Sequence, residues 1–168
     1  MDKSEILAIL NDWNYWNKEL PATKKRDFYD KKITAFLKND EVIVIKGIRR
    51  SGKSTLMINQ IKNLLGRGIS INDILIINLE DPRFINNLNF ELLQNIKDTY
   101  IQYLNPSSKP YIFLDEIQNI PLWEKWINKE YELKLSHLII SGSNSSMLSS
   151  EIASSLSGRY LSIDVYAL

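Results

Sequence analysis

Two kinds of hydrophobic pattern alternate along this chain. Short uninterrupted apolar runs, such as Val42-Ile43-Val44-Ile45, predict strands that are buried on both faces. Between these runs, apolar residues recur three and four positions apart, which predicts helices that bury one face. The alternation indicates a parallel α/β sheet with helices on both faces. The predicted strands are 42–45, 74–79, 111–114, 138–140 and 160–165, and the predicted helices are 4–19, 23–38, 54–65, 90–104, 122–134 and 146–156.

Two of these helices precede the first strand. Thr23 is the expected N-cap of the second one. The side chains expected to face inward are Ile6, Ile9, Leu10, Trp13 and Trp16 in the first helix, and Phe28, Ile33, Phe36 and Leu37 in the second.

The serine-rich stretch 141–157 allows two interpretations. Its composition is typical of a flexible linker. Its apolar residues nevertheless recur at helical spacing, so we favour a short helix over 146–156. The residues that carry this spacing are Met147, Leu148, Ile152 and Leu156.

A glycine-rich segment joins the first predicted strand to the helix that follows it. Residues 47–54 read GIRRSGKS, which matches the phosphate-loop pattern G-x-x-x-x-G-K-[ST] at every fixed position. Glycines let successive backbone N–H groups face a phosphate, and the start of the helix adds partial positive charge. Lys53 is expected to reach the β- and γ-phosphates, and the Ser54 hydroxyl to bind Mg²⁺. The expected nucleotide-binding residues are Gly47, Arg50, Ser51, Gly52, Lys53, Ser54 and Thr55.

The motif does not require the two arginines inside this loop. Arg49 and Arg50 can contact phosphate, or they can point to solvent or to a partner subunit, and both interpretations stay open.

Two acids follow the third predicted strand. Asp115 and Glu116 end the run Tyr111-Ile112-Phe113-Leu114, and ligands of parallel sheets gather at the carboxyl ends of the strands. Asp115 is therefore expected to hold Mg²⁺ together with Ser54. Glu116 is expected to orient and polarise the water that attacks the γ-phosphate.

Two further positions are candidates for the same chemistry. The fourth strand ends in Ser141-Gly142-Ser143-Asn144, where Ser143 or Asn144 could bond the γ-phosphate or the attacking water. Arg159, just before the fifth strand, could neutralise the transferring phosphoryl group, in cis or from a neighbouring subunit. A solvated loop and an ordinary surface arginine are the structural alternatives.

In five segments the chain resembles the AAA-type ATPases of archaea and bacteria that carry an uncharacterised C-terminal domain. The similar segments are VIKGIRRSGKSTL (44–56), NLEDPR (78–83), FLDEIQNIP (113–121), SGSN (141–144) and LSGR (156–159).

The resemblance implies a three-layer P-loop fold with strand order 5-1-4-3-2, made of N-terminal helices (1–39) and a nucleotide-binding core (40–168). It supports the roles of Lys53, Ser54, Asp115, Glu116 and Asn144, and it makes Arg159 a candidate arginine finger that acts in trans in a homo-oligomer. It also implies a C-terminal domain beyond Leu168, so we expect the sequence to be truncated at that end. No role for Glu80 or Asp81 follows beyond a polar strand tip.

Composition excludes several other classes of protein. The chain has no cysteine and one histidine, so disulfides, thiolate metal sites and histidine-rich metal sites are ruled out. Its net charge of +1 argues neither for nor against a nucleic-acid partner, which stays possible although no residues of this chain support it. No run approaches the roughly 20 apolar residues of a membrane helix. No signal peptide is visible either, so we expect a cytoplasmic protein.

The sequence therefore predicts an ATPase that uses ATP and Mg²⁺ and couples hydrolysis to a conformational change. The alternative is a nucleotide-gated switch with little turnover. A small-molecule P-loop kinase is less favoured, because no lid segment is apparent. A GTPase is disfavoured, because the N-K-x-D pattern that reads guanine is missing.

Overall fold

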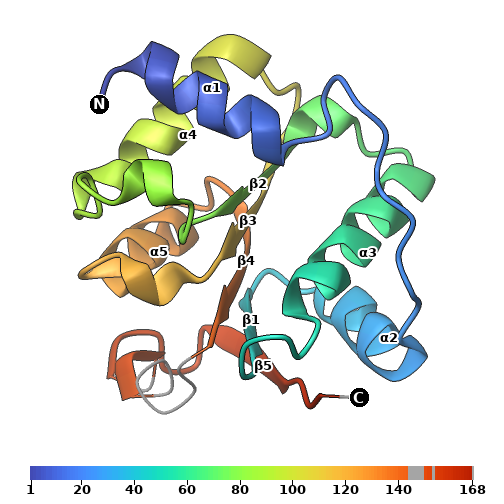
Figure 1. Ribbon diagram of the computed structural model, residues 1–168. Helices are drawn as coiled ribbons and strands as arrows, with labels where there is room; N and C mark the ends of the chain where they lie inside the picture. The colour runs from blue at the N-terminus through green and yellow to red at the C-terminus, as the bar shows by residue number, and fades with distance from the viewer. Residues whose placement is uncertain (144–149, 153, 168) are drawn as a thin grey trace.

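The computed structural model describes residues 1–143, 150–152 and 154–167, and within them five parallel strands form one sheet (Figure 1). The strands are β1 (Val42–Lys46), β2 (Ile74–Asn78), β3 (Tyr111–Asp115), β4 (His137–Gly142) and β5 (Tyr160–Asp164). The α-helices are α1 (Lys3–Trp13), α2 (Asp27–Phe36), α3 (Lys53–Gly66), α4 (Glu91–Leu104) and α5 (Trp123–Glu132).

The strands pair in the order β2-β3-β4-β1-β5, which confirms the predicted order 5-1-4-3-2. Strand β4 lies between β1 and β3, so that Ile139 pairs with both Ile43 and Phe113. This insertion brings the residues that follow β1, β3 and β4 to the same edge of the sheet. The arrangement therefore supplies one site from three segments that are far apart in the sequence.

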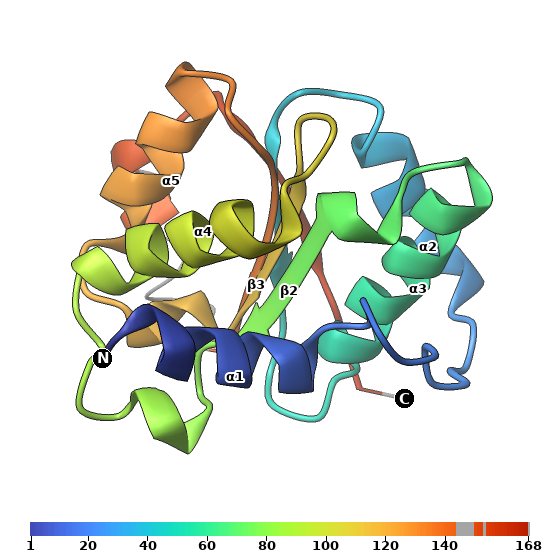
Figure 2. The same cartoon turned by 90° about the horizontal axis from the view of Figure 1, so that it is seen from above.

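Helices cover both faces of the sheet, as the continuous apolar strands require. Successive side chains of a strand point to opposite faces, and β1 shows this directly. Val42 and Val44 belong to the core under α1, α4 and α5, whereas Ile43 and Ile45 belong to the core under α2 and α3. Figures 1 and 2 show these two helical layers on either side of the sheet.

The N-terminal helices differ from the prediction. Helix α1 ends at Trp13 instead of residue 19, because the side chain of Asn14 bonds the backbone of β2 through Ile76 N and O, at 2.8 Å each. Trp16 lies beyond the helix and donates from Nε1 to the Ile74 carbonyl at 2.9 Å. Contacts with the sheet therefore override the helical period in this segment.

The second helix also starts later than predicted. Helix α2 begins at Asp27, and Thr23 is not its N-cap but donates to Asn59 Oδ1 on α3 at 2.5 Å. Phe28, which the pattern placed inside, is 72% exposed, whereas Ile33 and Leu37 are buried as predicted. The predicted helix over 146–156 lies partly outside the described residues, and residues 150–152 and 154–155 are helical.

A buried carboxylate lies between α4 and α5 together with one buried and one partly exposed lysine. Glu130 is fully buried, and its carboxylate contacts Lys97 Nζ at 2.6 Å and Lys129 Nζ at 3.1 Å. Ser136 donates a hydrogen bond to the same carboxylate at 3.2 Å. These four residues are referred to below as the α4–α5 charge cluster. None of the helices in the described ranges combines the length and the apolarity that a membrane crossing requires.

Candidate functional site

The glycine-rich segment forms the turn from β1 into α3. A side chain at Gly47 would lie 2.7 Å from both Ser51 Oγ and the Val165 carbonyl, so only glycine fits there. Gly52 has a φ of +94°, in the left-handed region that glycine adopts without strain. Both fixed glycines are therefore required by the geometry of this turn.

Lys53 is the first residue of α3, and its charged ammonium group is buried inside the turn. It is 4% exposed and donates to the carbonyls of Gly47 at 2.7 Å and Ile48 at 3.0 Å. It also donates to Ser143 Oγ at 3.4 Å and lies 3.7 Å from Glu116 Oε1. The ammonium group thus lies between the turn and the ends of β3 and β4.

Asp115 lies in the floor of the site and is 4% exposed. Its two oxygens accept hydrogen bonds from hydroxyl groups: Ser54 binds Oδ2 at 2.5 Å, and Ser141 of β4 binds Oδ1. Burial raises the pKa of Asp115 above its ordinary value, while the two hydroxyl groups oppose this shift and nearby Glu116 adds to it. A positive ion next to this carboxylate would favour its ionised form.

Glu116 leaves the strand with a φ of +57°, a left-handed conformation that costs a non-glycine residue about 1 kcal/mol. Adjacent side chains of a regular strand would point to opposite faces. The turn at Glu116 instead lets both carboxylates line the same cavity. Ser143 donates to the Glu116 carboxylate, with its Oγ 2.6 Å from both oxygens, and Gln118 Nε2 donates to Oε2 at 2.6 Å.

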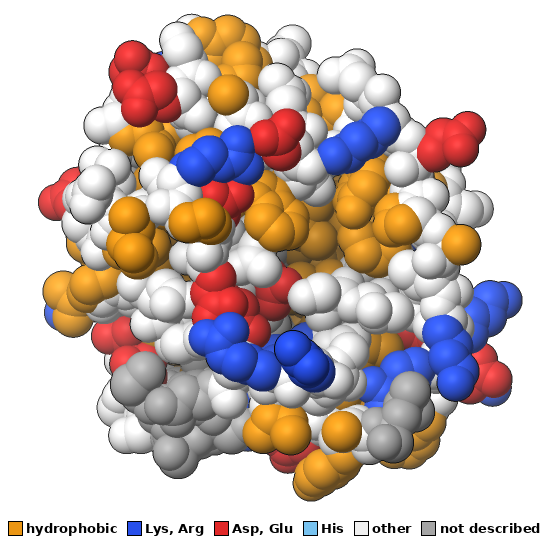
Figure 3. All heavy atoms as spheres, viewed as in Figure 1, with side chains coloured by type: hydrophobic (Ala, Val, Ile, Leu, Met, Phe, Trp, Pro, Cys, Tyr) orange, Lys and Arg blue, Asp and Glu red, His pale blue; other side chains and the backbone are white. Residues whose placement is uncertain are grey.

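The cavity above these groups has a volume of about 580 Å³. Arg49 and Glu80 both line it and form a two-pronged ion pair, which raises the pKa of Arg49. Figure 3 shows basic and acidic side chains side by side on this face of the molecule. The residues that line the cavity are Arg49, Arg50, Gly52, Lys53, Ser54, Thr55, Asn78, Glu80, Asp115 and Glu116.

The two acids that follow β2 have different surroundings. Glu80 faces the cavity, whereas Asp81 is held by Arg83, which donates from Nη2 at 2.8 Å, and by Trp13 Nε1 at 2.7 Å. The hydrogen bond from Arg83, opposed by burial, accounts for most of a fall in the pKa of Asp81 to about 2. Asp81 therefore ties the loop after β2 to the end of α1.

The structure brings together most of the predicted site residues. Gly47, Ser51, Gly52, Lys53, Ser54 and Thr55 lie in or beside the turn, and Arg50 borders the cavity with a φ of +64°. Ser143 lies between Lys53 and Glu116, and Asn144 falls outside the described residues.

Arg159 is the exception. It precedes β5, whose first residue pairs with Val42 at the start of β1, so it lies at the opposite edge of the sheet from the turn. Its guanidinium contacts Asn128 and Glu132 of α5, the latter at 2.5 Å, and lies over the ring of Tyr131. Within one chain Arg159 therefore does not reach the cavity.

Sequence reasoning missed three contributors to this site. Ser141 bonds both acidic residues, Glu80 pairs with Arg49, and Arg26 donates to the Ser51 carbonyl. The serine-rich end of β4 was a sequence signal for Ser141, and the polar residues that follow β2 were a signal for Glu80. Arg26 had no signal, because no local pattern links residue 26 to residue 51.

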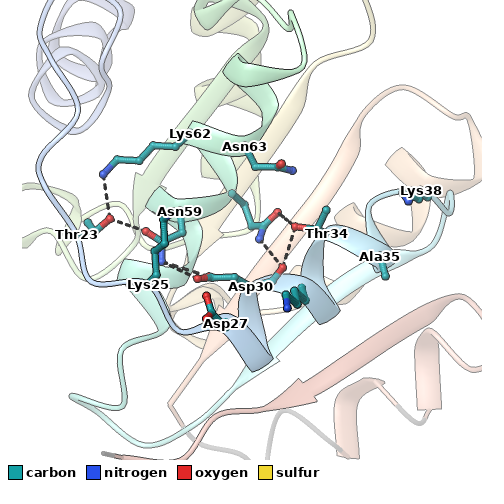
Figure 4. Close-up of a pocket in the computed structure, with 12 residues that line it drawn as sticks. Thr23, Lys25, Asp27, Asp30, Thr34, Ala35, Lys38, Asn59, Lys62 and Asn63 are labelled. Atoms are coloured by element: carbon teal, nitrogen blue, oxygen red, sulfur yellow. Dashed lines mark hydrogen bonds between the residues drawn. The ribbon is translucent and has the colours of Figure 1, made fainter.

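A second cavity of about 500 Å³ lies between α2 and α3 (Figure 4). Its polar lining includes Lys25, Asp30, Thr34, Asn59 and Lys62. None of the predicted site residues borders it, so it is separate from the cavity at the glycine-rich turn.

Similarity to known proteins agrees with the geometry. A family described as "AAA domain" matches residues 39–168. An uncharacterised protein of Haemophilus influenzae is 35% identical over 151 residues, which make up 88% of this chain and 36% of that protein. An uncharacterised protein of Methanocaldococcus jannaschii is 34% identical over 149 residues, 89% of this chain and 32% of that protein. This chain thus spans about a third of the length of these relatives.

The fold is also similar to that of a solved structure. The complex of Hsp104 from S. cerevisiae with ADP gives a TM-score of 0.59 at 12% identity, covering 99% of this chain and 24% of that one. At this identity the likeness concerns the fold, which is that of P-loop NTPases.

Proposed function

This chain belongs to the AAA domain family, and on that premise we propose that it binds ATP with Mg²⁺ at the glycine-rich turn and hydrolyses the ATP. The fold is that of nucleotide-binding P-loop ATPases. We further propose that hydrolysis drives a conformational change that acts on a target outside these residues. The observation that carries the proposal is the direct bond between Ser54 and Asp115 beside the Lys53 ammonium group.

One hydroxyl and one carboxylate fit a hard cation whose remaining coordination positions are filled by water and phosphate oxygens. Ser54 Oγ and Asp115 Oδ2 lie 2.5 Å apart, so both oxygens can turn toward one ion. Among the described residues no group of three or more Cys, His, Asp and Glu side chains could hold a metal by itself. This supports Mg²⁺ bound through one carboxylate, one hydroxyl and the nucleotide. When bound by Ser54 and Asp115, Mg²⁺ would supply positive charge that offsets the negative charge of the transferring phosphoryl group.

The residues of the chain divide the remaining work. In the proposed mechanism the backbone N–H groups of the turn bind the phosphates, and Lys53 exchanges its carbonyl partners for phosphate oxygens. Glu116 holds the attacking water and withdraws its proton toward the carboxylate. Ser143, which contacts both Lys53 and Glu116, is placed to respond to the γ-phosphate. Asn144 remains an alternative for that role.

Arg159 enters the proposal only through a second copy of the chain. Its distance from its own cavity supports a role in trans, as an arginine finger for a neighbouring subunit. In that case the hydrolysis rate rises faster than linearly with protein concentration, which phosphate-release assays over a dilution series would measure.

A nucleotide-gated switch is the second candidate, and one observation favours it. The carboxylate of Glu116 is already bound by Ser143 and Gln118, and these donors compete with an attacking water for its oxygens. A chain in which this arrangement persists after ATP binds would retain nucleotide with little turnover. Phosphate release by the chain with bound ATP separates the two candidates.

The test of the proposal is calorimetric titration with a non-hydrolysable ATP analogue and Mg²⁺. Lys53→Ala is expected to abolish detectable binding, because it removes the buried cation between the turn and the acids. The control Lys62→Ala removes a lysine of the same helix that borders the other cavity, and it should bind as the wild type does. A GTP analogue tests base preference. Equal binding by Lys53→Ala and the wild type would refute the proposed site.

A further inference from the structure

Arg26 connects three parts of the molecule that meet behind the glycine-rich turn. Its Nη1 donates to the Ser51 carbonyl at 2.5 Å, and its Nη2 donates to the Tyr166 carbonyl at 2.8 Å. The guanidinium also lies over the ring of Tyr29, 4.6 Å from its centroid. In turn, the Tyr29 hydroxyl accepts a hydrogen bond from Tyr166 N at 3.1 Å. One arginine from the N-terminal segment thus binds both the turn and the chain that follows β5.

The contact with Ser51 bears on the orientation of one peptide unit. A trans peptide directs its C=O and its N–H to opposite sides. Arg26 holds the Ser51 carbonyl from outside the turn, so the N–H of the same peptide, which belongs to Gly52, points the other way. Gly52 borders the cavity. The guanidinium therefore fixes a backbone donor on the side where a phosphate would lie, and its charge polarises that donor further.

Gly52 itself fits this arrangement closely. A Cβ at this position would lie 2.8 Å from Arg26 Nη1, in addition to the strain of a φ of +94°. The guanidinium thus fills the space that a side chain would need. The glycine of the motif allows the turn, and it also allows the arginine to approach the peptide from behind.

Other contacts hold Arg26 in place. Its backbone N–H donates to Asp30 Oδ2 at 2.8 Å, and Asn59 Nδ2 of α3 donates to the same carboxylate at 3.2 Å and 3.3 Å. Figure 4 shows Asp30 and Asn59 facing each other between α2 and α3. Helix α3 begins at Lys53, so the arginine and the turn are anchored to the same helix.

We propose that Arg26 is a positioning residue for the phosphate loop, which sets the Ser51–Gly52 peptide so that the Gly52 amide faces the nucleotide phosphates. The expected effect of Arg26 on nucleotide affinity rests on the proposed function. The orientation of the Gly52 amide itself can be measured without nucleotide.

The first measurement is the amide resonance of Gly52 in ¹⁵N-labelled chain without nucleotide. Arg26→Ala is expected to displace this resonance, and guanidinium ion at tens of millimolar is expected to move it back by occupying the vacated space. Arg67→Ala, which removes an exposed arginine at the end of α3, is the matched control and should leave the resonance in place. An unchanged Gly52 resonance in Arg26→Ala would overturn the inference.

The second measurement is the affinity for the non-hydrolysable ATP analogue with Mg²⁺. Loss of a charge-assisted hydrogen bond is expected to weaken binding by about 10- to 100-fold in Arg26→Ala, with partial rescue by guanidinium. Arg26→Lys keeps the charge but can reach only one of the two carbonyls, so it should lie between Arg26→Ala and the wild type. If Arg26→Ala does not fold, Arg26→Lys is the variant that tests the proposal. Wild-type affinity in Arg26→Ala, or a loss that guanidinium does not reduce, would contradict the proposal.

The two measurements separate this inference from the proposed function. If neither the wild type nor Arg67→Ala binds the analogue, the proposed function fails, while the Gly52 resonance still decides the role of Arg26. If both bind and Arg26→Ala binds equally well, the proposed function stands and the positioning role is refuted.

Discussion

Two buried groups of charge in this protein are built from the same residue types in different ways. In the α4–α5 charge cluster, the Glu130 carboxylate contacts two lysine ammonium groups directly. In the cavity, Asp115 and Glu116 are bound mainly by neutral donors, and the Lys53 ammonium group is bound mainly by backbone carbonyls. Among these three groups the closest cation–carboxylate approach is 3.7 Å, between Lys53 and Glu116, and the direct ion pair of Arg49 with Glu80 lies apart from them in the cavity lining.

The difference shows how each group can respond to a ligand. Opposite charges in direct contact satisfy each other, so an added ion would first have to break a buried ion pair. Charges that are held apart by hydroxyl and carbonyl groups can exchange these neutral partners for an ion or a phosphate. The α4–α5 charge cluster is therefore complete as it stands, whereas the cavity can accept both signs of charge. Substitutions in both groups would test this distinction.

The largest effect is expected for Glu116→Gln, which keeps the shape of the side chain but removes its charge. Turnover should fall by about 100- to 10,000-fold, because the proposed general base is lost. Affinity for the ATP analogue should change little, and phosphate release together with calorimetry would measure both. Glu19→Gln, at an exposed acid, is the control. Hydrolysis at the wild-type rate in Glu116→Gln would show that Glu116 is not the general base.

A large effect of another kind is expected for Glu130→Gln. Removing one partner of a buried ion pair leaves Lys97 uncompensated, which should lower the free energy of unfolding by about 3 kcal/mol. The corresponding fall in melting temperature is roughly 6–12 °C for a chain of this length. Below that temperature, affinity for the ATP analogue should match the wild type.

The double variant Glu130→Leu with Lys97→Met completes this test. It replaces both charges by apolar groups, so it should recover most of the lost stability. A change in nucleotide affinity in either variant would mean that the two charge groups are coupled, contrary to the distinction drawn above.

The smallest effect is expected for Asp115→Asn, and it should be a gain in stability. Without Mg²⁺ the buried carboxylate is unfavourable when ionised, so its removal should raise the melting temperature at neutral pH by roughly 2–4 °C, as expected for a gain of about 1 kcal/mol. The same variant should lose the Mg²⁺-dependent part of ATP affinity. A lower melting temperature would indicate that the ionised carboxylate is stabilising in its present surroundings.

The sign of the pH dependence follows from the direction of the shift. Burial, with a further contribution from Glu116, raises the pKa of Asp115, so the folded chain retains this proton at pH values where the unfolded chain has lost it. Without Mg²⁺, the Asp115 contribution to the free energy of unfolding therefore falls as pH rises from the ordinary aspartate pKa through the raised pKa. It stays at its lower level above that range. Melting curves over this range, compared with Asp115→Asn, would isolate the contribution.

Much of the fold could be predicted because the strands are buried on both faces. A continuous apolar run such as 111–114 followed by two acids has few structural interpretations, and the glycine-rich turn marks the end of another run. The strand order came from family resemblance, since periodicity alone does not say which strands are neighbours. Ser143 or Asn144 was predicted to take part in the site, and Ser143 lies beside Glu116 because β4 is inserted between β1 and β3.

The errors arose where tertiary contacts override local pattern. Trp16 continues the apolar period of α1, yet the chain leaves the helix because Asn14 bonds the backbone of β2. Phe28 has the spacing of a core residue, yet α2 turns it outward. The contacts between Arg26 and Ser51 and between Arg49 and Glu80 join residues 25 and 31 positions apart, a separation at which no periodicity applies.

The bonds that end α1 also affect how the sheet can grow. Strand β2 is an edge strand of the sheet. An edge strand ordinarily has a row of unpaired N–H and C=O groups that can pair with a strand of another chain. The carboxamide of Asn14 supplies both an acceptor for Ile76 N and a donor for its carbonyl, as a neighbouring backbone would. Trp16 Nε1 caps the next outward carbonyl, at Ile74. Two side chains thus imitate a sixth strand, and they leave this edge of the sheet less open to β-augmentation by another chain.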